Sequence, residues 1–292
     1  MNLHRAAIFA RVVDEGGITA AARALGLPKS AVSQAVSRLE RELGVRLLNR
    51  SSRATTVTEA GAILHRRAAP ALRALEDASV EVVDAQGPLR GRVRMTAPVE
   101  VATRLLEPHL SRFMALHPGV RLELTLTSHV LDLAEEGIDL AVRGGPVHDE
   151  GLVARNLGVH DAGLFAAPSY LRRRGRPRGL ADLANHDCVV YRPTAGRGTW
   201  ALSGPEGAES VEVEARLGVD HFSYLVRAVA AGAGIGLLPL FLCESEVAGG
   251  DLLRVLPSYA LRDTPLRLLY AAKRYLSRPA AELRDYLLGR LG

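Results

Sequence analysis

The chain has 292 residues, of which 48% are hydrophobic and 24% charged, a composition typical of a globular protein with two or more domains. No apolar run approaches the roughly 20 residues of a membrane span, and the N-terminus lacks the apolar core of a signal peptide, so we expect a cytoplasmic protein. Two isolated cysteines, Cys188 and Cys243, predict neither a disulfide framework nor a zinc site, and we expect no metal and no cofactor.

Positive charge is concentrated in the first 60 residues. One lysine and eight arginines there stand against five acids, which places +4 of the net +5 in a fifth of the chain. A compact basic module is typical of a protein that binds a polyanion such as DNA. A charged surface that keeps the protein in solution would give the same balance, so charge alone does not decide.

Three helices are predicted within this basic segment. Apolar residues at helical spacing indicate a first helix over 3–14. Thr19 is placed to cap a second helix over 20–25. A tight break at 26–28 ends in proline, which suits the start of a third helix over 29–43. Two short helices joined by a glycine turn are typical of a helix-turn-helix.

The third helix has two contrasting faces. Its apolar stripe consists of Val32, Val36, Leu39 and Leu43. The opposite face carries short hydroxyls and an amide in place of the mixed Glu and Lys of a solvated helix. Glutamine pairs with adenine and lysine with guanine in the major groove, and short hydroxyls let the backbone approach phosphates. We therefore predict DNA contacts from Lys29, Ser30, Ser33, Gln34, Ser37 and Arg38.

A small hairpin is predicted after the third helix. Residues 45–50 and 54–58 read as two short strands around a turn at 51–53. Arg50 and Arg53 would lie at its tip, where arginines suit phosphates or a narrow minor groove. The segment therefore predicts an all-α winged helix-turn-helix domain over residues 1–59. Any one of these residues taken alone could equally be an ordinary surface side chain.

Long runs of this segment resemble the LysR-type transcriptional regulator family. The runs are Ala20-Ala21-Ala22-Arg23-Ala24-Leu25, Ser30-Ala31-Val32-Ser33-Gln34, Leu39-Glu40, Leu43-Gly44-Val45-Arg46-Leu47-Leu48-Asn49-Arg50 and Thr58-Glu59-Ala60-Gly61. The resemblance covers essentially the whole chain. It implies that Ser33 and Gln34 face DNA, although arginine is frequent in the family where this chain has Gln34. It also implies a homodimer that assembles into a homotetramer, and contact with RNA polymerase if the protein is an activator.

One long helix is predicted over residues 59–86, with Thr58 as its cap and proline and glycine just beyond its end. Pro70 should kink it. A coiled-coil-like stripe runs along it, made of Leu64, Ala68, Ala71, Leu72, Leu75, Ala78 and Val82. The resemblance implies dimerisation through this linker, residues 60–87; packing of the helix on its own C-terminal domain is the alternative.

Residues 88–292 read as an α/β effector-binding domain. Strands near 93–95, 120–126 and 139–143 alternate with helices, which indicates a parallel sheet. Further strands and helices predict a second lobe, so we expect lobe I over 88–161 and 267–292 and lobe II over 162–266. Two α/β lobes joined by two crossing strands are similar to the architecture of periplasmic binding proteins, as in the family's sensor domain.

A ligand in an open α/β sheet lies beyond the carboxyl ends of the strands. The residues there, and at the start of a helix in the second lobe, are Thr96, Pro98, Val99, Ser128, Arg143, Asp220 and His221. The hydroxyls of Thr96 and Ser128 beside helix N-termini would favour an anionic effector. The two hydroxyls could equally cap their own helices, and His221 could be a structural or rim residue.

We expect a ligand-responsive regulator, not an enzyme, bound to a pseudo-palindromic site on double-stranded DNA. An enzyme or transport-type binding protein with a DNA-binding appendage is one alternative, but no nucleophile–base pair or metal cluster is readable. A DNA-compacting protein is another, and it would not need a two-lobed sensor. The glycines of residues 232–236 follow a predicted helix and open a strand, so they read as a helix end, not a phosphate loop.

Overall fold

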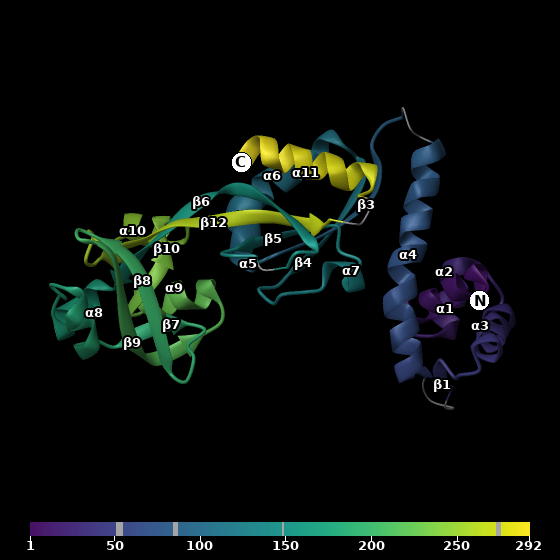
Figure 1. Ribbon diagram of the computed structural model, residues 1–292, viewed down its shortest axis with the longest axis horizontal. Helices are drawn as coiled ribbons and strands as arrows, with labels where there is room; N and C mark the ends of the chain where they lie inside the picture. Colours follow the sequence, from purple (N-terminus) through teal and green to yellow (C-terminus); the bar gives the residue numbers. More distant parts are fainter. Residues whose placement is uncertain (51–54, 84–86, 148, 273–275) are drawn as a thin grey trace.

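The computed structural model describes residues 1–50, 55–83, 87–147, 149–272 and 276–292. Figure 1 shows three parts in chain order: a small helical N-terminal domain, one long helix, and a sheet-containing C-terminal domain drawn out into two lobes. The N-terminal domain packs on one side of the long helix and the first lobe on the other.

The N-terminal domain contains α1 (Leu3–Asp14), α2 (Ile18–Leu25), α3 (Lys29–Leu43), β1 (Leu48–Arg50) and β2 (Thr55–Val57). The three helices and the antiparallel hairpin confirm the predicted helix-turn-helix and wing. Apolar residues of every helix and of β1 meet in one core, which consists of Ile8, Phe9, Val12, Ile18, Ala21, Ala22, Val32, Val36, Leu39, Leu47 and Leu48.

Two details of the predicted helices were wrong. The second helix begins at Ile18 with Gly17 at its N-cap, so Thr19 lies inside the first turn and is not the cap. The buried side chain of Ile18 joins the core and explains why the helix starts earlier than its polar residue suggests. Leu43 is 37% exposed and does not continue the buried stripe of α3, because the helix ends there and Gly44 turns the chain at φ 69°.

The wing is fastened to α3 by a carboxylate. Glu40 Oε1 accepts hydrogen bonds from the backbone N–H groups of Leu47 and Leu48, at 2.8 and 3.1 Å. Leu47 directly precedes the hairpin and Leu48 begins β1, so the carboxylate sets the direction in which the strand leaves the helix. We therefore expect the hairpin to move together with α3.

The long helix α4 (Glu59–Val83) begins at the predicted cap, where Thr58 Oγ1 accepts a hydrogen bond from Gly61 N–H at 3.0 Å. Leu64, the first residue of the predicted stripe, packs against the N-terminal core. Farther along, α4 contacts α7 (Leu133–Glu136) and β3 (Arg90–Ala97) of the C-terminal domain. Arg67 pairs with Glu135 of α7 at 3.0 Å. The helix thus packs on its own C-terminal domain, which was the alternative to dimerisation, while Leu75 on the stripe is 56% exposed.

Lobe I is built on three parallel strands, as predicted. Strand β3 lies between β4 (Gly119–Leu126) and β5 (Leu140–Gly144) and pairs in parallel with both. Helices α5 (Val99–Val101) and α6 (Glu107–Leu116), the π-helical turn η1 (Ala102–Leu106) between them, and α11 (Arg278–Leu291) complete the lobe. The short helix α7 starts at Leu133, because Asp132 caps it by accepting from the N–H groups of Ala134 and Glu135.

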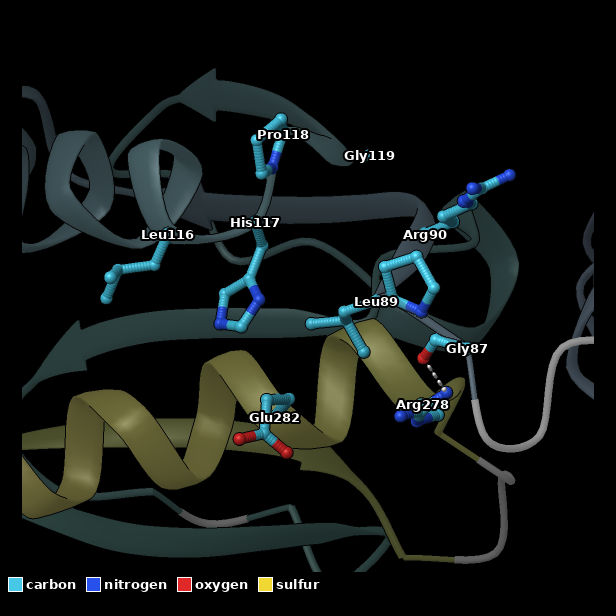
Figure 2. Close-up of a pocket in the computed structure, with 10 residues that line it drawn as sticks. Gly87, Leu89, Arg90, Leu116, His117, Pro118, Gly119, Arg278 and Glu282 are labelled. Carbon is cyan, nitrogen blue, oxygen red and sulfur yellow. Dashed lines mark hydrogen bonds between the residues drawn. The ribbon is translucent and has the colours of Figure 1, made fainter.

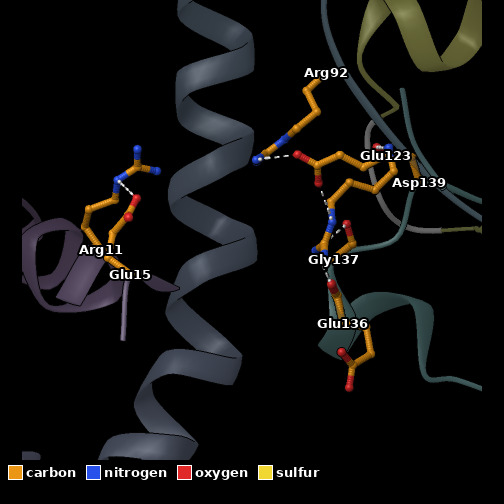
Figure 3. Close-up of polar contacts among 8 residues, drawn as sticks. Arg11, Glu15, Arg92, Glu123, Glu136, Gly137 and Asp139 are labelled. Atoms are coloured by element: carbon orange, nitrogen blue, oxygen red, sulfur yellow. Dashed lines mark hydrogen bonds and ion pairs between the residues drawn. The ribbon is translucent and has the colours of Figure 1, made fainter. Parts of the chain in front are cut away.

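Polar contacts fix α7 to the sheet beside the long helix (Figure 3). Arg94 on β3 donates its side chain to the carbonyls of Glu136 and Gly137, and its backbone N–H to Asp139 at 2.8 Å. Its guanidinium also pairs with Glu123 of β4 at 3.3 Å. The α7 turn that Arg67 of the long helix touches is therefore held rigidly to lobe I.

Lobe II carries a second hydrophobic core on a mixed sheet. Its elements are α8 (Pro168–Arg174), η2 (Leu180–Asn185), β7 (Cys188–Tyr191), β8 (Arg197–Gly204), β9 (Gly207–Val219), α9 (Phe222–Ala230), β10 (Ile235–Pro239), η3 (Leu240–Leu242), α10 (Glu244–Ala248) and β11 (Leu253–Arg254). Gly232 has φ 84° directly after α9, so the glycine run ends a helix as predicted.

Two long antiparallel strands, β6 (Leu152–Ala166) and β12 (Ala260–Ala271), run from one lobe into the other (Figure 1). They are the predicted crossing strands. Because each of the two strands also pairs with strands of a lobe, the described strands of both lobes form one continuous sheet. Its strand order is β11-β6-β10-β7-β9-β8-β12-β5-β3-β4. The crossing pair is irregular between Leu261 and Thr264, where Asp263 adopts φ 53° and donates its N–H to Asp161.

Gly61 lies where α4 packs closely against the wing. Any side chain at this position should therefore lower the stability of the N-terminal domain. A methyl group there would overlap the Leu47 carbonyl oxygen and lie 2.9 Å from Val57 Cγ1. We expect Gly61→Ala to destabilise the N-terminal domain by about 1–3 kcal/mol, as overpacking does. Calorimetric unfolding of the full chain measures this.

Gly289→Ala is the matched control, because Gly289 is also helical and has open space around its Cα. Alanine there should be neutral or stabilise by up to about 1 kcal/mol through helix propensity. Equal unfolding temperatures for the two variants would contradict the close approach at Gly61.

Candidate DNA interface and effector site

The predicted DNA-contacting side chains lie on the outer face of α3. Lys29, Ser30, Gln34 and Arg38 are exposed and Ser33 is half-buried, while Val32 and Val36 on the opposite side have no exposure. The helix can present this face because its other face fills the domain core. The arrangement leaves a basic, hydroxyl-rich surface unoccupied by other described elements.

Three predicted contacts differ in status from the rest. Ser37 is half-buried and donates its hydroxyl to the Ser33 carbonyl at 3.0 Å, so that proton is already used within the helix. Arg50 ends β1, where its backbone pairs with Thr55, and its side chain lies outside the described part of the structure. Arg53 lies outside the described residues altogether.

In lobe I, Thr96 and Arg143 are in direct contact. Thr96 is 0% exposed, and its Oγ1 accepts from Arg143 Nη2 at 3.1 Å. The same nitrogen donates to the His129 carbonyl at 3.1 Å, and Arg143 Nη1 donates to the Val142 carbonyl at 2.7 Å. Burial lowers the pKa of Arg143 from its usual value. The guanidinium thus ties together the carboxyl ends of β3 and β5 and the loop after β4.

Arg192 joins this region to lobe II. It follows β7 at φ 46° and donates Nη2 to the Ser128 carbonyl of lobe I at 3.3 Å. Its guanidinium also lies over the Tyr191 ring, 5.4 Å from the centroid, and Tyr191 stacks on Phe222 at 4.0 Å. Ser128 therefore lies between the lobes as expected, but its backbone oxygen makes this contact.

Glu100 makes the second link between the lobes, and the sequence analysis missed it. It lies on α5 of lobe I and is 3% exposed. Its Oε1 accepts from Ser223 N–H at 2.8 Å and from Ser223 Oγ at 3.0 Å, at the start of α9 in lobe II. His221 Nδ1 lies 4.0 Å from the same oxygen. A lone acid inside an apolar stretch right after the predicted Pro98 and Val99 was the available signal.

The remaining predicted effector residues lie close in the chain to residues that join the lobes. Pro98 is the N-cap of α5, and the Val99 carbonyl accepts a hydrogen bond from Thr103. His221 is the N-cap of α9 and is half exposed, with Asp220 exposed just before it. Of these residues, His221 lies beside the Glu100–Ser223 contact, 4.0 Å from the Glu100 carboxylate.

A pocket of about 870 Å³ lies at the other edge of lobe I (Figure 2). It opens at the amino ends of β3 and β4, where the linker enters the lobe, and Arg278 donates to the Gly87 carbonyl at 3.1 Å in its wall. His117 and Glu282 face the same space. The carboxyl ends of the lobe I strands differ from this pocket, because the buried polar residues Thr96 and Glu100 lie there and Glu100 bonds to lobe II.

The other sequence signals have structural roles. Both cysteines are buried, Cys188 at the start of β7 and Cys243 before α10. Arg173 and Arg174 at the end of α8 donate to the Gly232 and Asn185 carbonyls. The described part of the chain holds no group of three residues suited to a metal ion.

Thr96→Val tests whether the buried hydroxyl is structural. The substitution keeps the volume but removes an acceptor from the half-buried Arg143 guanidinium, which should destabilise lobe I by about 1–3 kcal/mol. Thermal unfolding of the full chain measures it. Thr103→Val is the control, since the exposed Thr103 bonds only within its own helix and should change stability little. Equal stability of the two variants would remove Arg143–Thr96 as an anchor.

The two thiols should be unreactive in the folded protein. Burial, with a smaller contribution from the neighbouring acids Asp187 and Glu246, raises the pKa of each thiol from 9.0 to about 12. The thiolate population at pH 8 then falls about 1000-fold. We expect iodoacetamide to alkylate the native chain at least that much more slowly than the urea-unfolded chain, with the native rate still rising above pH 9. A rapidly labelled native cysteine would contradict this.

Comparison with known proteins agrees with this arrangement. Residues 3–62 match the bacterial regulatory helix-turn-helix protein, lysR family, and residues 86–292 match the LysR substrate binding domain. A transcriptional regulator of the helix-turn-helix type from Xanthomonas campestris is 34% identical over 99% of this chain and 86% of the relative. CrgA from Neisseria meningitidis is 30% identical over 100% of this chain and 97% of its own.

Solved structures match over the full length. AphB, a virulence activator of Vibrio cholerae, superposes with a TM-score of 0.65 at 27% identity, covering all of both chains. The CrgA structure superposes with a TM-score of 0.64 at 29% identity, covering 100% of this chain and 99% of that one. None of the described helices has the length and apolar character of a membrane span. The chain therefore belongs to the LysR family of transcriptional regulators, with a DNA-binding helix-turn-helix followed by a substrate-binding domain.

Proposed function

We propose that this protein regulates transcription by binding a pseudo-palindromic DNA site as a homo-oligomer, under control of a small molecule held between its lobes. Residues 1–59 bind DNA, residues 60–87 link and dimerise, and residues 88–292 sense the effector. The observation that carries the proposal is the outer face of α3, which is exposed, basic and rich in hydroxyls while its other face fills the core.

The DNA contacts proposed are those of Lys29, Ser30, Ser33, Gln34 and Arg38, with Arg50 and Arg53 on the wing. Gln34 stands in the middle of the exposed face, where an amide can read a base edge. The arginines at the wing neutralise phosphates, which gives affinity without sequence choice. Ser37 has a weaker claim to DNA, because its hydroxyl proton is bonded within the helix.

The homodimer forms through α4. Two apolar side chains of α4 are exposed, those of Ile63 at 49% and Leu75 at 56%, while Leu64 packs against the N-terminal core. Exposed apolar residues on a long helix favour association with a second copy. Two such dimers would form the tetramer, and contact with RNA polymerase would follow if the protein activates. The protein acts by binding and is not an enzyme.

The effector lies between the lobes, at Thr96, Pro98, Val99, Ser128, Arg143, Asp220 and His221. Support comes from the contacts Arg192–Ser128 and Glu100–Ser223, which join the lobes here and would respond to any change in their separation. A ligand shifts the arrangement only as far as it binds one arrangement more tightly than the other. The linker, which touches lobe I through Arg67 and Glu135, can pass that change to the DNA-binding domains.

Footprinting of the DNA upstream of the protein's own gene, against excess unrelated DNA, tests the function. We expect protection of a pseudo-palindromic site that survives the competitor. Uniform coverage removed by competitor would point to a DNA-compacting protein instead.

Substitutions separate base reading from phosphate contact. Gln34→Ala should lower discrimination at one base pair by about 1–3 kcal/mol, whereas Arg53→Ala should weaken binding to all sequences and reduce the salt slope by about 1. Arg172→Ala is the control, since it removes an equal charge from an exposed position of α8 in the C-terminal domain. A footprint unchanged in both test variants, or lost in the control, would show that the DNA face is misplaced.

A further inference from the structure

The carboxylate of Glu100 is only half satisfied between the lobes. Its Oε1 accepts both hydrogen bonds from Ser223, whereas Oε2 is buried and has no hydrogen-bond partner among the described residues. The nearest ring nitrogen of His221 is 4.0 Å from Oε1, too far for a hydrogen bond. A buried carboxylate oxygen without a donor is costly, so the site lacks one hydrogen-bond donor.

The two arginines at the inter-lobe junction, Arg143 and Arg192, already donate hydrogen bonds to the chain. Arg143 donates to Thr96 Oγ1 and to the carbonyls of His129 and Val142. Arg192 donates to the Ser128 carbonyl and stacks on Tyr191. The side chains of Arg143 and Arg192 are therefore bonded to the chain itself, whereas Glu100 Oε2 can still accept a hydrogen bond.

The N-terminus of α9 is likewise filled. Helix N-termini attract anions, and α9 is the helix of lobe II that opens at this junction. Glu100 from lobe I occupies that position through the Ser223 N–H. A carboxylate ligand would have to displace Glu100, which would then be buried beside a like charge.

Because Glu100 Oε2 has no hydrogen-bond partner among the described residues, closure of the two lobes depends on an added hydrogen-bond donor. When the lobes separate, water can reach Glu100 and hydrate both oxygens. When the lobes come together, Ser223 satisfies Oε1 but Oε2 stays bare. A donor supplied by a ligand removes this penalty in the closed arrangement alone, so it stabilises that arrangement selectively.

We propose that the effector carries an ammonium or guanidinium group that donates to Glu100 Oε2 and holds the lobes together through the Glu100–Ser223 contact. The charge is the reverse of the anionic effector that the hydroxyls of Thr96 and Ser128 suggested from the sequence. The inference rests on the proposed function insofar as it takes the junction between the lobes as the effector site.

Hydrogen exchange of the full chain, read by mass spectrometry on peptides covering residues 219–230, tests the ligand's charge. The probes are agmatine, with a guanidinium and an ammonium, and succinate, with two carboxylates on a similar carbon chain. We expect agmatine to slow exchange at the start of α9 about tenfold or more, the range of a hydrogen bond to a charged group, and succinate to leave it unchanged. Slowing by succinate, or none by agmatine, overturns the proposal.

Glu100→Gln tests the residue. The amide keeps the Oε1 acceptor for Ser223 but presents N–H donors in place of Oε2, so the agmatine effect should disappear while α9 keeps its basal protection. Glu107→Gln is the matched control, because this exposed acid of α6 is removed from the junction and should leave the agmatine effect intact. An agmatine effect retained in Glu100→Gln, or lost in Glu107→Gln, overturns the assignment.

Two further measurements keep the result interpretable. If Glu100→Gln fails to fold, as shown by its thermal unfolding, the contrast between agmatine and succinate on the unaltered chain decides alone. The upstream footprint is recorded in parallel without probe. A missing footprint with an intact agmatine effect defeats the proposed DNA function and leaves the ligand chemistry standing; the converse result does the opposite.

Discussion

The antiparallel pairing of β6 with β12 is the constraint on which the C-terminal domain depends. Both strands leave one lobe and enter the other, so the backbone ladder is continuous while the hydrophobic cores of the two lobes are separate. The crossing strands hold the two lobes together, and we propose that the lobes open and close by a change of angle where the pairing is irregular, near Asp263. Beyond this hinge, the side chains of Glu100 and Arg192 bridge the lobes. They should therefore strongly influence the angle between the two lobes.

We propose that the linker helix transmits such a change to the DNA-binding domain. Helix α4 packs against α1 at one end and against α7 and β3 farther along, so it is in contact with both the N-terminal domain and lobe I. Arg94 fixes the α7 turn to the sheet, and Glu40 fixes the wing to α3. The first contact joins α7 to lobe I and the second joins the wing to α3. We therefore expect the lobes and the N-terminal domain to move as whole units.

Buried polar groups mark the two kinds of contact in the C-terminal domain. Thr96 and Arg143 bond to each other and to backbone within lobe I, which makes them anchors of that lobe. Glu100 instead bonds across the lobes and keeps one oxygen without a donor. A satisfied network favours one geometry, whereas a half-satisfied one leaves the geometry open to a ligand.

The sequence by itself predicted the three helices and the hairpin of the N-terminal domain, the long linker helix, the three parallel strands of lobe I and the two contrasting faces of α3. Periodicity and turn residues are local signals, and α3 reads as amphipathic because its own residues decide both faces. Tertiary structure alone decided that Ile18 extends α2 into the core, that α4 rests on lobe I, and that Glu100 meets Ser223. The last two residues are 123 positions apart, and no local pattern records such a contact, because it exists only once two separately folded lobes are held by crossing strands.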